Sequence, residues 1–248
     1  QQMIASFPHW YHQIELAPGI VTPGNCDTKS YIEKLEALGF PKDFTGLRVL
    51  DIGCADGFFA FTAEKRGAQH VVGVDYRNPT SSGYGIASEI LGSKVEYHVE
   101  NVYDLSPEKY GTFDVVLFLG LLYHLRNPML AFDRVRAMVK PGGSLFVETQ
   151  LIDNHFLTED GTVTTLAKIS PTLSMMPLWQ FYRGETLAKD PTNKWAPNMT
   201  ALRHMMEEAQ FEVIHTAIHG ARGMVMAKAV KDHKREFYRQ LDESKGKW

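Results

Sequence analysis

Two carboxylates and two glycines early in the chain have the spacing of a nucleoside-binding turn. The segment VLDIGCADGFF, residues 49–59, carries Asp51 at the end of an apolar run, followed by Gly53 and Gly57. Glycines let the backbone bend and approach a ligand closely. Asp75 ends the next apolar run, about twenty residues further on, where a carboxylate can accept both hydroxyls of a ribose. The alternative is an ordinary turn with packing glycines and a solvated strand-end acid.

The same turn lacks the glycines that a pyrophosphate needs. Dinucleotide-binding turns follow the pattern G-x-G-x-x-G, in which phosphates rest on a helix N-terminus. Here Ala55 and Phe58 stand at the second and third glycine positions, and the carboxylate of Asp51 would repel a phosphate. That carboxylate suits an amino group, and ribose plus ammonium without phosphate describes S-adenosylmethionine (SAM). Asn101 and Val102 are expected to meet the adenine edge.

Three polar residues after the later apolar runs, Tyr123, His124 and Glu148, are candidates for catalysis. Tyr123 and His124 follow FDVVLFLGLL, and His124 could be a general base because histidine titrates near neutrality. The alternative is that His124 only orders its loop. Alternation along SLFVETQ places Glu148 and Gln150 on one side of a strand. Glu148 is interpreted as a base or substrate ligand, with a structural ion pair to an arginine as the alternative.

Two irregular segments are expected to cover the site. Residues 1–28 are interpreted as a flap and residues 153–197 as a substrate lid, called the insertion below. Aromatic rings with an arginine can bind an acceptor, and the alternative is that the rings only close the insertion's own core. The residues predicted to bind substrate are Tyr11, His12, Gln150, Trp179, Tyr182, Trp195, Asn198 and Arg222. No pair of ligands at metal spacing accompanies His12, so no metal is expected.

Helix-like and strand-like runs alternate along the rest of the chain. Strands are expected at 48–52, 70–76, 95–99, 113–119, 144–152, 212–220 and 223–230. Helices are expected at 29–39, 58–68, 82–92, 128–139, 198–211 and 231–247, with a turn at 141–143. This alternation predicts an α/β fold with a doubly wound parallel sheet.

Composition narrows the class of protein. The chain has 248 residues, 44% of them hydrophobic, and a net charge of −3, which fits a single domain over 1–248. Two cysteines indicate a reducing, cytoplasmic compartment. No apolar run reaches the roughly 20 residues that span a bilayer. Without a global basic field, a small molecule is favoured over nucleic acid as partner. The oligomeric state stays open.

The ordered segments VLDIGCADG, VVGVD, FDVVLFLGLLYHLRNP and KPGGSLFVET resemble the motif series of class I SAM-dependent methyltransferases. The resemblance implies a seven-stranded, mostly parallel Rossmann-like sheet with a reversed final strand. It also implies that Asp51 and Gly53 lie near the methionine part of SAM and Asp75 at the ribose. The expected cofactor-binding residues are Asp51, Gly53, Ala55, Gly57, Asp75, Tyr76, Asn101, Val102 and Leu119.

A narrower resemblance covers FPHWYHQIELAPGIVTPG, LLYHLRNP, VETQLID and WAPNMTALRHMMEEAQF, which look like the tRNA wobble-uridine (mo5U34/carboxymethyl) methyltransferase-like family. The wobble-uridine enzymes carry a long N-terminal extension and a lysine that grips the carboxylate of carboxy-SAM. Neither is found here, and residues 8–28 contain no lysine. The expected function is therefore methyl transfer from ordinary SAM to a small-molecule, biosynthetic acceptor. The alternatives are tRNA wobble-uridine modification and a catalytically idle SAM-binding protein.

Overall fold

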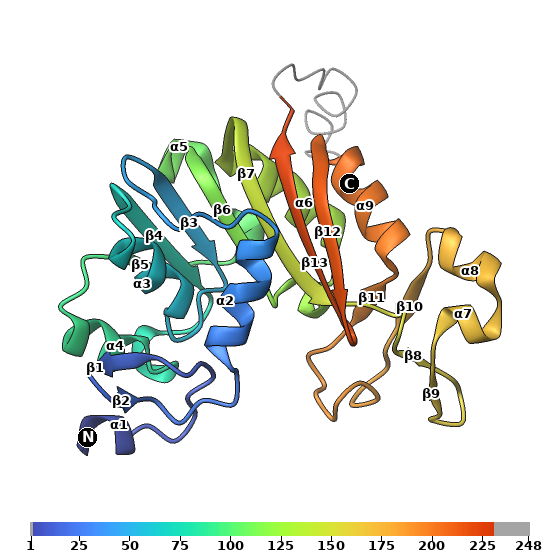
Figure 1. Cartoon of the computed structure of the whole chain (residues 1–248), viewed down its shortest axis with the longest axis horizontal. Helices are drawn as coiled ribbons and strands as arrows, with labels where there is room; N and C mark the ends of the chain where they lie inside the picture. Colours follow the sequence, from blue (N-terminus) through green and yellow to red (C-terminus); the bar gives the residue numbers. More distant parts are fainter. Residues whose placement is uncertain (1, 231–248) are drawn as a thin grey trace, which may run out of the picture.

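A single twisted sheet forms the centre of the molecule in the computed structural model, which describes residues 2–230 (Figure 1). Its strands in chain order are β3 Arg48–Ile52, β4 His70–Asp75, β5 Glu96–Val99, β6 Phe113–Leu119, β7 Val139–Gln150, β12 Phe211–His219 and β13 Arg222–Ala229. They are arranged as β12-β13-β7-β6-β3-β4-β5. The five strands β3 to β7 are parallel, whereas β13 runs antiparallel to both of its neighbours. The predicted seven-stranded sheet with a reversed final strand is confirmed.

Helices cover both faces of this sheet because its parallel strands are apolar on both sides. The main helices are α2 Thr28–Ala37, α3 Phe58–Lys65, α4 Tyr84–Leu91, α6 Pro128–Met138 and α9 Met199–Glu208, with a short α5 Pro107–Tyr110. Alternation along β6 sends Val115 and Leu117 into the core under α2, α3 and α4. It sends Val116 and Phe118 into the core under α6 and α9. The predicted helix over 231–247 lies outside the described residues.

The insertion has short elements of its own and projects beside the ends of β12 and β13 (Figure 1). They are β8 Phe156–Leu157, β9 Val163–Thr164, α7 Leu166–Ile169, α8 Pro171–Met175, β10 Trp179–Phe181 and β11 Trp195–Pro197. A small apolar core of Ile152, Leu166, Tyr182, Leu187 and Ala196 holds the insertion together. The insertion is therefore a packed unit with an apolar core of its own.

The N-terminal residues form α1 Gln2–Ala5, β1 Glu15–Ala17 and β2 Ile20–Val21, which lie below α4 in Figure 1. Three single turns of 3₁₀ helix follow strands: η1 Pro79–Ser81, η2 Val102–Asp104 and η3 Leu122–His124. Within residues 2–230, no helix is long and apolar enough to cross a bilayer.

The predicted turn at 141–143 is wrong in one respect. β7 begins at Val139 and continues through these residues, with a shift of register against β6 between Phe113 and Val115. A Cβ on Gly143 would lie 2.9 Å from the Lys140 carbonyl oxygen and 3.1 Å from that of Asp114. Glycine permits this close backbone approach, so the strand bulges here and does not end.

Candidate functional site

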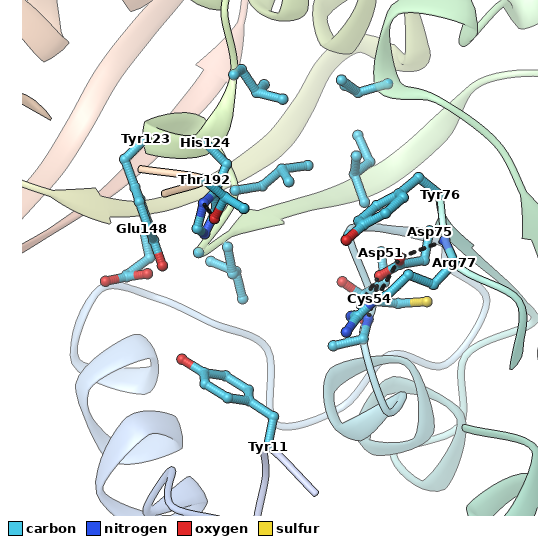
Figure 2. A pocket seen from close by; sticks show the side chains of 18 of the residues that line it. Tyr11, Asp51, Cys54, Asp75, Tyr76, Arg77, Tyr123, His124, Glu148 and Thr192 are labelled. Carbon is cyan, nitrogen blue, oxygen red and sulfur yellow. Dashed lines mark hydrogen bonds and ion pairs between the residues drawn. The ribbon is translucent and has the colours of Figure 1, made fainter. Parts of the chain in front are cut away.

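A cavity of about 1180 Å³ opens at the carboxyl ends of the parallel strands. The strand order reverses between β3 and β6, and open α/β sheets bind ligands at such a switch point. Figure 2 shows two groups of polar side chains in this pocket, one around Asp51 and Asp75 and one around Tyr123 and Glu148. Of the nine residues predicted for the cofactor, Asp51, Gly53, Ala55, Asp75, Tyr76, Asn101, Val102 and Leu119 line the pocket.

Asp51 is the most unusual group at the first end. Its side chain lies at the end of β3 and is 2% exposed, and its Oδ2 has no hydrogen-bond partner among the described residues. Burial raises the pKa of Asp51 to about 7, with Asp75 and Asp56 adding to the rise and the Ala60 N–H opposing it. A buried carboxylate oxygen without a donor is costly. This oxygen can therefore accept a hydrogen bond from a ligand, and the ammonium group of an amino-acid ligand suits it when Asp51 is ionised.

The turn after β3 places backbone against the pocket. Gly53 has φ of +74°, and Ala55 adopts the left-handed region as well, with φ of +54°. A Cβ on Gly53 would lie 3.1 Å from the Leu121 side chain, so glycine keeps this wall of the pocket open. Left-handed backbone at a non-glycine residue is uncommon and often marks a functional turn.

Gly57 does not line the pocket, and its role in binding the cofactor stays a prediction. It caps α3 with φ of +90°, and a Cβ there would lie 2.5 Å from the ring of Phe61 and 2.8 Å from that of Tyr84. Glycine is needed at this position for helix packing.

Asp75 at the end of β4 is held in place by several N–H donors. Its Oδ2 accepts the Ala55 backbone N–H at 3.0 Å, and its Oδ1 accepts the Arg77 backbone N–H at 3.0 Å and Nε–H at 3.1 Å. Sequence reasoning missed Arg77, which lines the pocket two residues beyond the acid. These contacts fix the carboxylate where a ribose is expected.

The remaining predicted cofactor residues form the rim and floor. The ring of Tyr76 is 71% exposed at the pocket edge. Asn101 caps η2, because its side-chain oxygen accepts the Tyr103 backbone N–H at 3.0 Å. Its amide nitrogen takes no part in this hydrogen bond. Val102 and Leu119 are buried apolar walls. Such a mixture can hold a flat heteroaromatic ring, with an apolar face and a polar edge.

A bidentate ion pair dominates the second end of the pocket. Arg222 Nη2 donates to Glu148 Oε2 at 2.9 Å, and its Nε donates to Oε1. The same Nη2 donates to the Tyr123 hydroxyl at 3.1 Å, and the guanidinium carbon lies 4.6 Å from the Tyr123 ring centre. Gln150 lies beside them. This pair is the structural alternative for Glu148, whose role as a base stays a prediction.

Two tyrosines face this ion pair from the N-terminal part of the chain. Tyr11, a predicted substrate residue, lines the pocket on the side opposite Glu148 and Tyr123 (Figure 2). Tyr31 of α2 also lines it, and burial followed by the charge of Glu148 raises its pKa well above the usual value. The sequence placed Tyr31 within a predicted helix and gave it no role in the site, so this pocket residue was missed. Its hydroxyl stays protonated, and a hydrogen bond to Glu148 contributes to the raised pKa.

His12 ties the N-terminal segment to Asp56. Its backbone N–H donates to Asp56 Oδ2 at 2.8 Å, and its Nδ1 contacts Asp56 Oδ1. The Tyr11 backbone N–H donates to the same carboxylate at 3.0 Å. His12 thus lines the pocket, but one of its ring nitrogens is committed to a structural contact. The part of the chain from 2 to 230 holds no group of three or more His, Cys, Asp or Glu side chains placed to bind a metal ion.

His124 stands on η3 at the same end of the pocket as Tyr123 (Figure 2). Its Nδ1 lies 2.9 Å from the Thr192 hydroxyl oxygen, and Lys194 donates its backbone N–H to the Tyr123 carbonyl at 2.8 Å. Burial lowers the pKa of His124, outweighing Asp190 and the Thr192 backbone. The insertion therefore reaches the pocket through residues 187–193, of which Leu187, Ala188, Asp190, Thr192 and Asn193 line it.

Three predicted substrate residues of the insertion, and Asn198 directly after it, lie outside the pocket lining, so their role in binding substrate stays a prediction. Tyr182 is 2% exposed in the insertion's own core, as the alternative interpretation held. Trp179 packs against the core under α6 and α9, and the Trp195 ring lies tilted against that of Phe181 with ring centres 4.7 Å apart. Asn198 is fully buried and caps α9 by accepting the Ala201 N–H at 2.9 Å.

The fold and the pocket at its switch point are those of class I methyltransferases. Residues 27–216 match the family described as a methyltransferase domain, so the chain belongs to that family. The predicted resemblance to class I SAM-dependent methyltransferases is confirmed.

Two curated relatives differ in their acceptors. A ubiquinone biosynthesis O-methyltransferase of Xanthomonas euvesicatoria pv. vesicatoria is 33% identical over 116 residues, which cover 47% of this chain and 48% of the relative. A tRNA U34 carboxymethyltransferase of Campylobacter hominis is 32% identical over 111 residues, 45% of this chain and 39% of the relative. The matched region spans less than half the length of either relative.

A solved S-adenosylmethionine-dependent methyltransferase from Mesorhizobium loti has the same fold. It is 17% identical with a TM-score of 0.58, and the match covers 79% of this chain and 96% of that chain.

Proposed function

We propose that this chain transfers a methyl group from SAM to a small-molecule acceptor. The observation that carries the proposal is the buried, unpartnered Oδ2 of Asp51, which shares one pocket with the strand-end carboxylate of Asp75. The residues fit SAM because an ammonium group suits Asp51 and a ribose suits Asp75. Bound SAM supplies an activated methyl group on a sulfonium.

The chain's own contribution is to bind and orient the two reactants. Asp51, Asp75 and Asn101 are expected to hold the amino-acid, ribose and adenine parts of SAM at one end of the pocket. Tyr11, Tyr123 and the other polar groups at the second end are expected to hold the acceptor. Fixing two reactants at close range lowers the barrier to transfer, and a closed pocket excludes competing water.

The first prediction concerns Asp75. Asp75→Ala should weaken the binding of SAM and of S-adenosylhomocysteine by about 1.5–3 kcal/mol, or about 10- to 150-fold, because a charged hydrogen bond is lost. Isothermal titration calorimetry measures both affinities. Asp104→Ala is the matched control, since Asp104 is exposed on η2 and is not part of the pocket lining. Tight binding of NAD with no binding of SAM would overturn the proposal.

A second candidate function is the modification of the tRNA wobble uridine. The relatives named tRNA U34 carboxymethyltransferase favour it, at 32% identity over 111 residues. The class of acceptor separates the two candidates. An assay offers the protein labelled SAM with either bulk tRNA or a catechol, and label in tRNA alone would favour the second candidate.

The second prediction concerns the methyl donor. Ordinary SAM should bind at least as tightly as carboxy-SAM, because no lysine within 2–230 lines the pocket and Arg222 already faces Glu148. An additional carboxylate at the second end would thus have to compete with Glu148 for the guanidinium of Arg222. Competition between the two donors for bound S-adenosylhomocysteine gives the ratio of affinities. A clear preference for carboxy-SAM would contradict the expectation.

A further inference from the structure

The segment from Asp190 to Lys194 contacts His124 through the ring nitrogen Nδ1. The Thr192 hydroxyl donates to Asp190 Oδ1 at 2.6 Å, and the Thr192 backbone N–H donates to the same oxygen at 2.8 Å. The same hydroxyl oxygen lies 2.9 Å from His124 Nδ1. Asp190, Thr192 and His124 thus form a continuous chain of contacts from the insertion to η3, and all three line the pocket.

The direction of each hydrogen bond in this chain follows from proton counting. An ionised carboxylate can only accept, and a hydroxyl has a single proton. Burial raises the pKa of Asp190. The hydrogen bonds from Thr192 and the nearby His124 and Lys194 lower this pKa by more than burial raises it, so the net shift is downward. The Thr192 proton is therefore given to Asp190. His124 Nδ1 must then be the donor to the Thr192 oxygen.

We propose that Asp190 and Thr192 are positioning residues that hold His124 with its proton on Nδ1, so that Nε2 accepts the proton of an acceptor hydroxyl. This proposal rests on the proposed methyl transfer and assigns the acceptor class as a hydroxyl compound. As the acceptor oxygen forms its bond to the methyl carbon, the carbon–sulfur bond breaks and the sulfonium becomes a neutral thioether. The hydroxyl proton moves to Nε2, which makes an imidazolium.

The surroundings suit this role for His124. Burial keeps the imidazole neutral near pH 7, because it lowers the pKa of His124, and a base must be neutral to take a proton. The lone pair then lies on the nitrogen that Thr192 does not occupy. Glu148 at the same end is already bound through both oxygens by Arg222, so it is poorly suited to take a proton.

The direct test is the tautomer of His124, read from its ¹⁵N chemical shifts in histidine-labelled protein. The chain has ten histidines, so the His124 signals are assigned by their loss in His124→Gln. We expect a protonated Nδ1 and an unprotonated Nε2 in the wild type, and a shift of the proton towards Nε2 in Thr192→Val. A wild-type His124 with its proton on Nε2 overturns the proposal.

Kinetics with SAM and a catechol as acceptor form the second arm. Thr192→Val should lower kcat at least about 10-fold with little change in KM, and Thr192→Ser should restore most of the loss. Thr172→Val is the matched control, because Thr172 is exposed on α8 in the same insertion. Equal kcat for the Val and Ser variants overturns the proposal. Loss of SAM binding by the wild type would refute the proposed function, while the tautomer measurement would still decide the positioning role.

Discussion

Asp51→Asn should make the ligand-free protein more stable at pH 8 and at the same time weaken SAM binding by about 1.5–3 kcal/mol. Both effects have one origin. Burial and two neighbouring carboxylates raise the pKa of Asp51 to about 7, so the ionised form is unfavourable in the empty pocket. The amide of asparagine carries no charge and keeps the shape of the side chain, but it cannot attract an ammonium group.

The pH dependence gives this prediction its sign. Between pH 4 and pH 7 the folded protein holds a proton on Asp51 that the unfolded chain has lost, since an ordinary aspartate has a pKa of 3.8. The stability of the wild type therefore falls as pH rises through 7. By linkage, the free energy of unfolding of the wild type should fall by about 2–3 kcal/mol between pH 5 and pH 8. Asp51→Asn should not show this fall. SAM affinity should move the other way and increase through pH 7, as the carboxylate ionises.

Urea unfolding of both proteins at pH 5 and pH 8 measures the difference in free energy, and calorimetry measures SAM affinity at the same pH values. Asp104→Asn serves as the control, because this exposed carboxylate should change neither quantity by more than about 0.5 kcal/mol. The same loss of stability with pH in wild type and Asp51→Asn would show that another group causes it. Unchanged SAM affinity in the variant would remove Asp51 from the site.

The sheet and one end of the pocket could be predicted from sequence because their signals are local. Apolar runs of β-branched residues define parallel strands, and the acids Asp51 and Asp75 follow two of them directly. Parallel strands bring their carboxyl ends to one edge, so position in the sequence translates into position in the pocket. Asn101 follows the third strand for the same reason.

The other end depends on contacts between distant segments, which periodicity does not reveal. Tyr31 belongs to a helix whose spacing indicates packing, yet it faces Glu148 across the pocket. Composition of the insertion pointed to its aromatic residues, but Trp195 and Tyr182 serve its own packing. Smaller or polar side chains such as Asp190 and Thr192 line the pocket in their place. Asparagine is common both at helix N-caps and in ligand-binding sites, so the sequence could not separate these two roles at Asn198.

Arg222→Met should destabilise the protein by about 2–4 kcal/mol, although its side chain is partly exposed. Glu148 is 1% exposed and has both carboxylate oxygens in contact with Arg222. Removing the guanidinium leaves a buried carboxylate without a cation, which costs about 3–5 kcal/mol in fully buried pairs. Because the Arg222 side chain is 32% exposed, water can replace part of the lost interaction, and the expected effect is smaller.

A double-mutant cycle separates the cost of leaving the Glu148 carboxylate unpaired from the cost of losing the packing of Arg222. Glu148→Gln alone should cost about 1 kcal/mol, since the amide oxygen can still accept from Arg222. Combining it with Arg222→Met removes the stranded carboxylate, so the double variant should be more stable than Arg222→Met alone, with a coupling energy of about 2 kcal/mol. Chemical unfolding of the four proteins supplies the cycle.

The exposed pair of Arg203 and Glu207 on α9 is the matched control. Its side chains are 52% and 47% exposed, so Arg203→Met should cost less than about 1 kcal/mol. A small effect at Arg222 as well would show that Glu148 does not depend on the guanidinium and remains available as a base. SAM affinity measured on the same variants links this result to the site. If the pair serves the acceptor end alone, Arg222→Met should leave SAM affinity within about threefold of wild type, because Asp51 and Asp75 lie at the other end of the pocket (Figure 2).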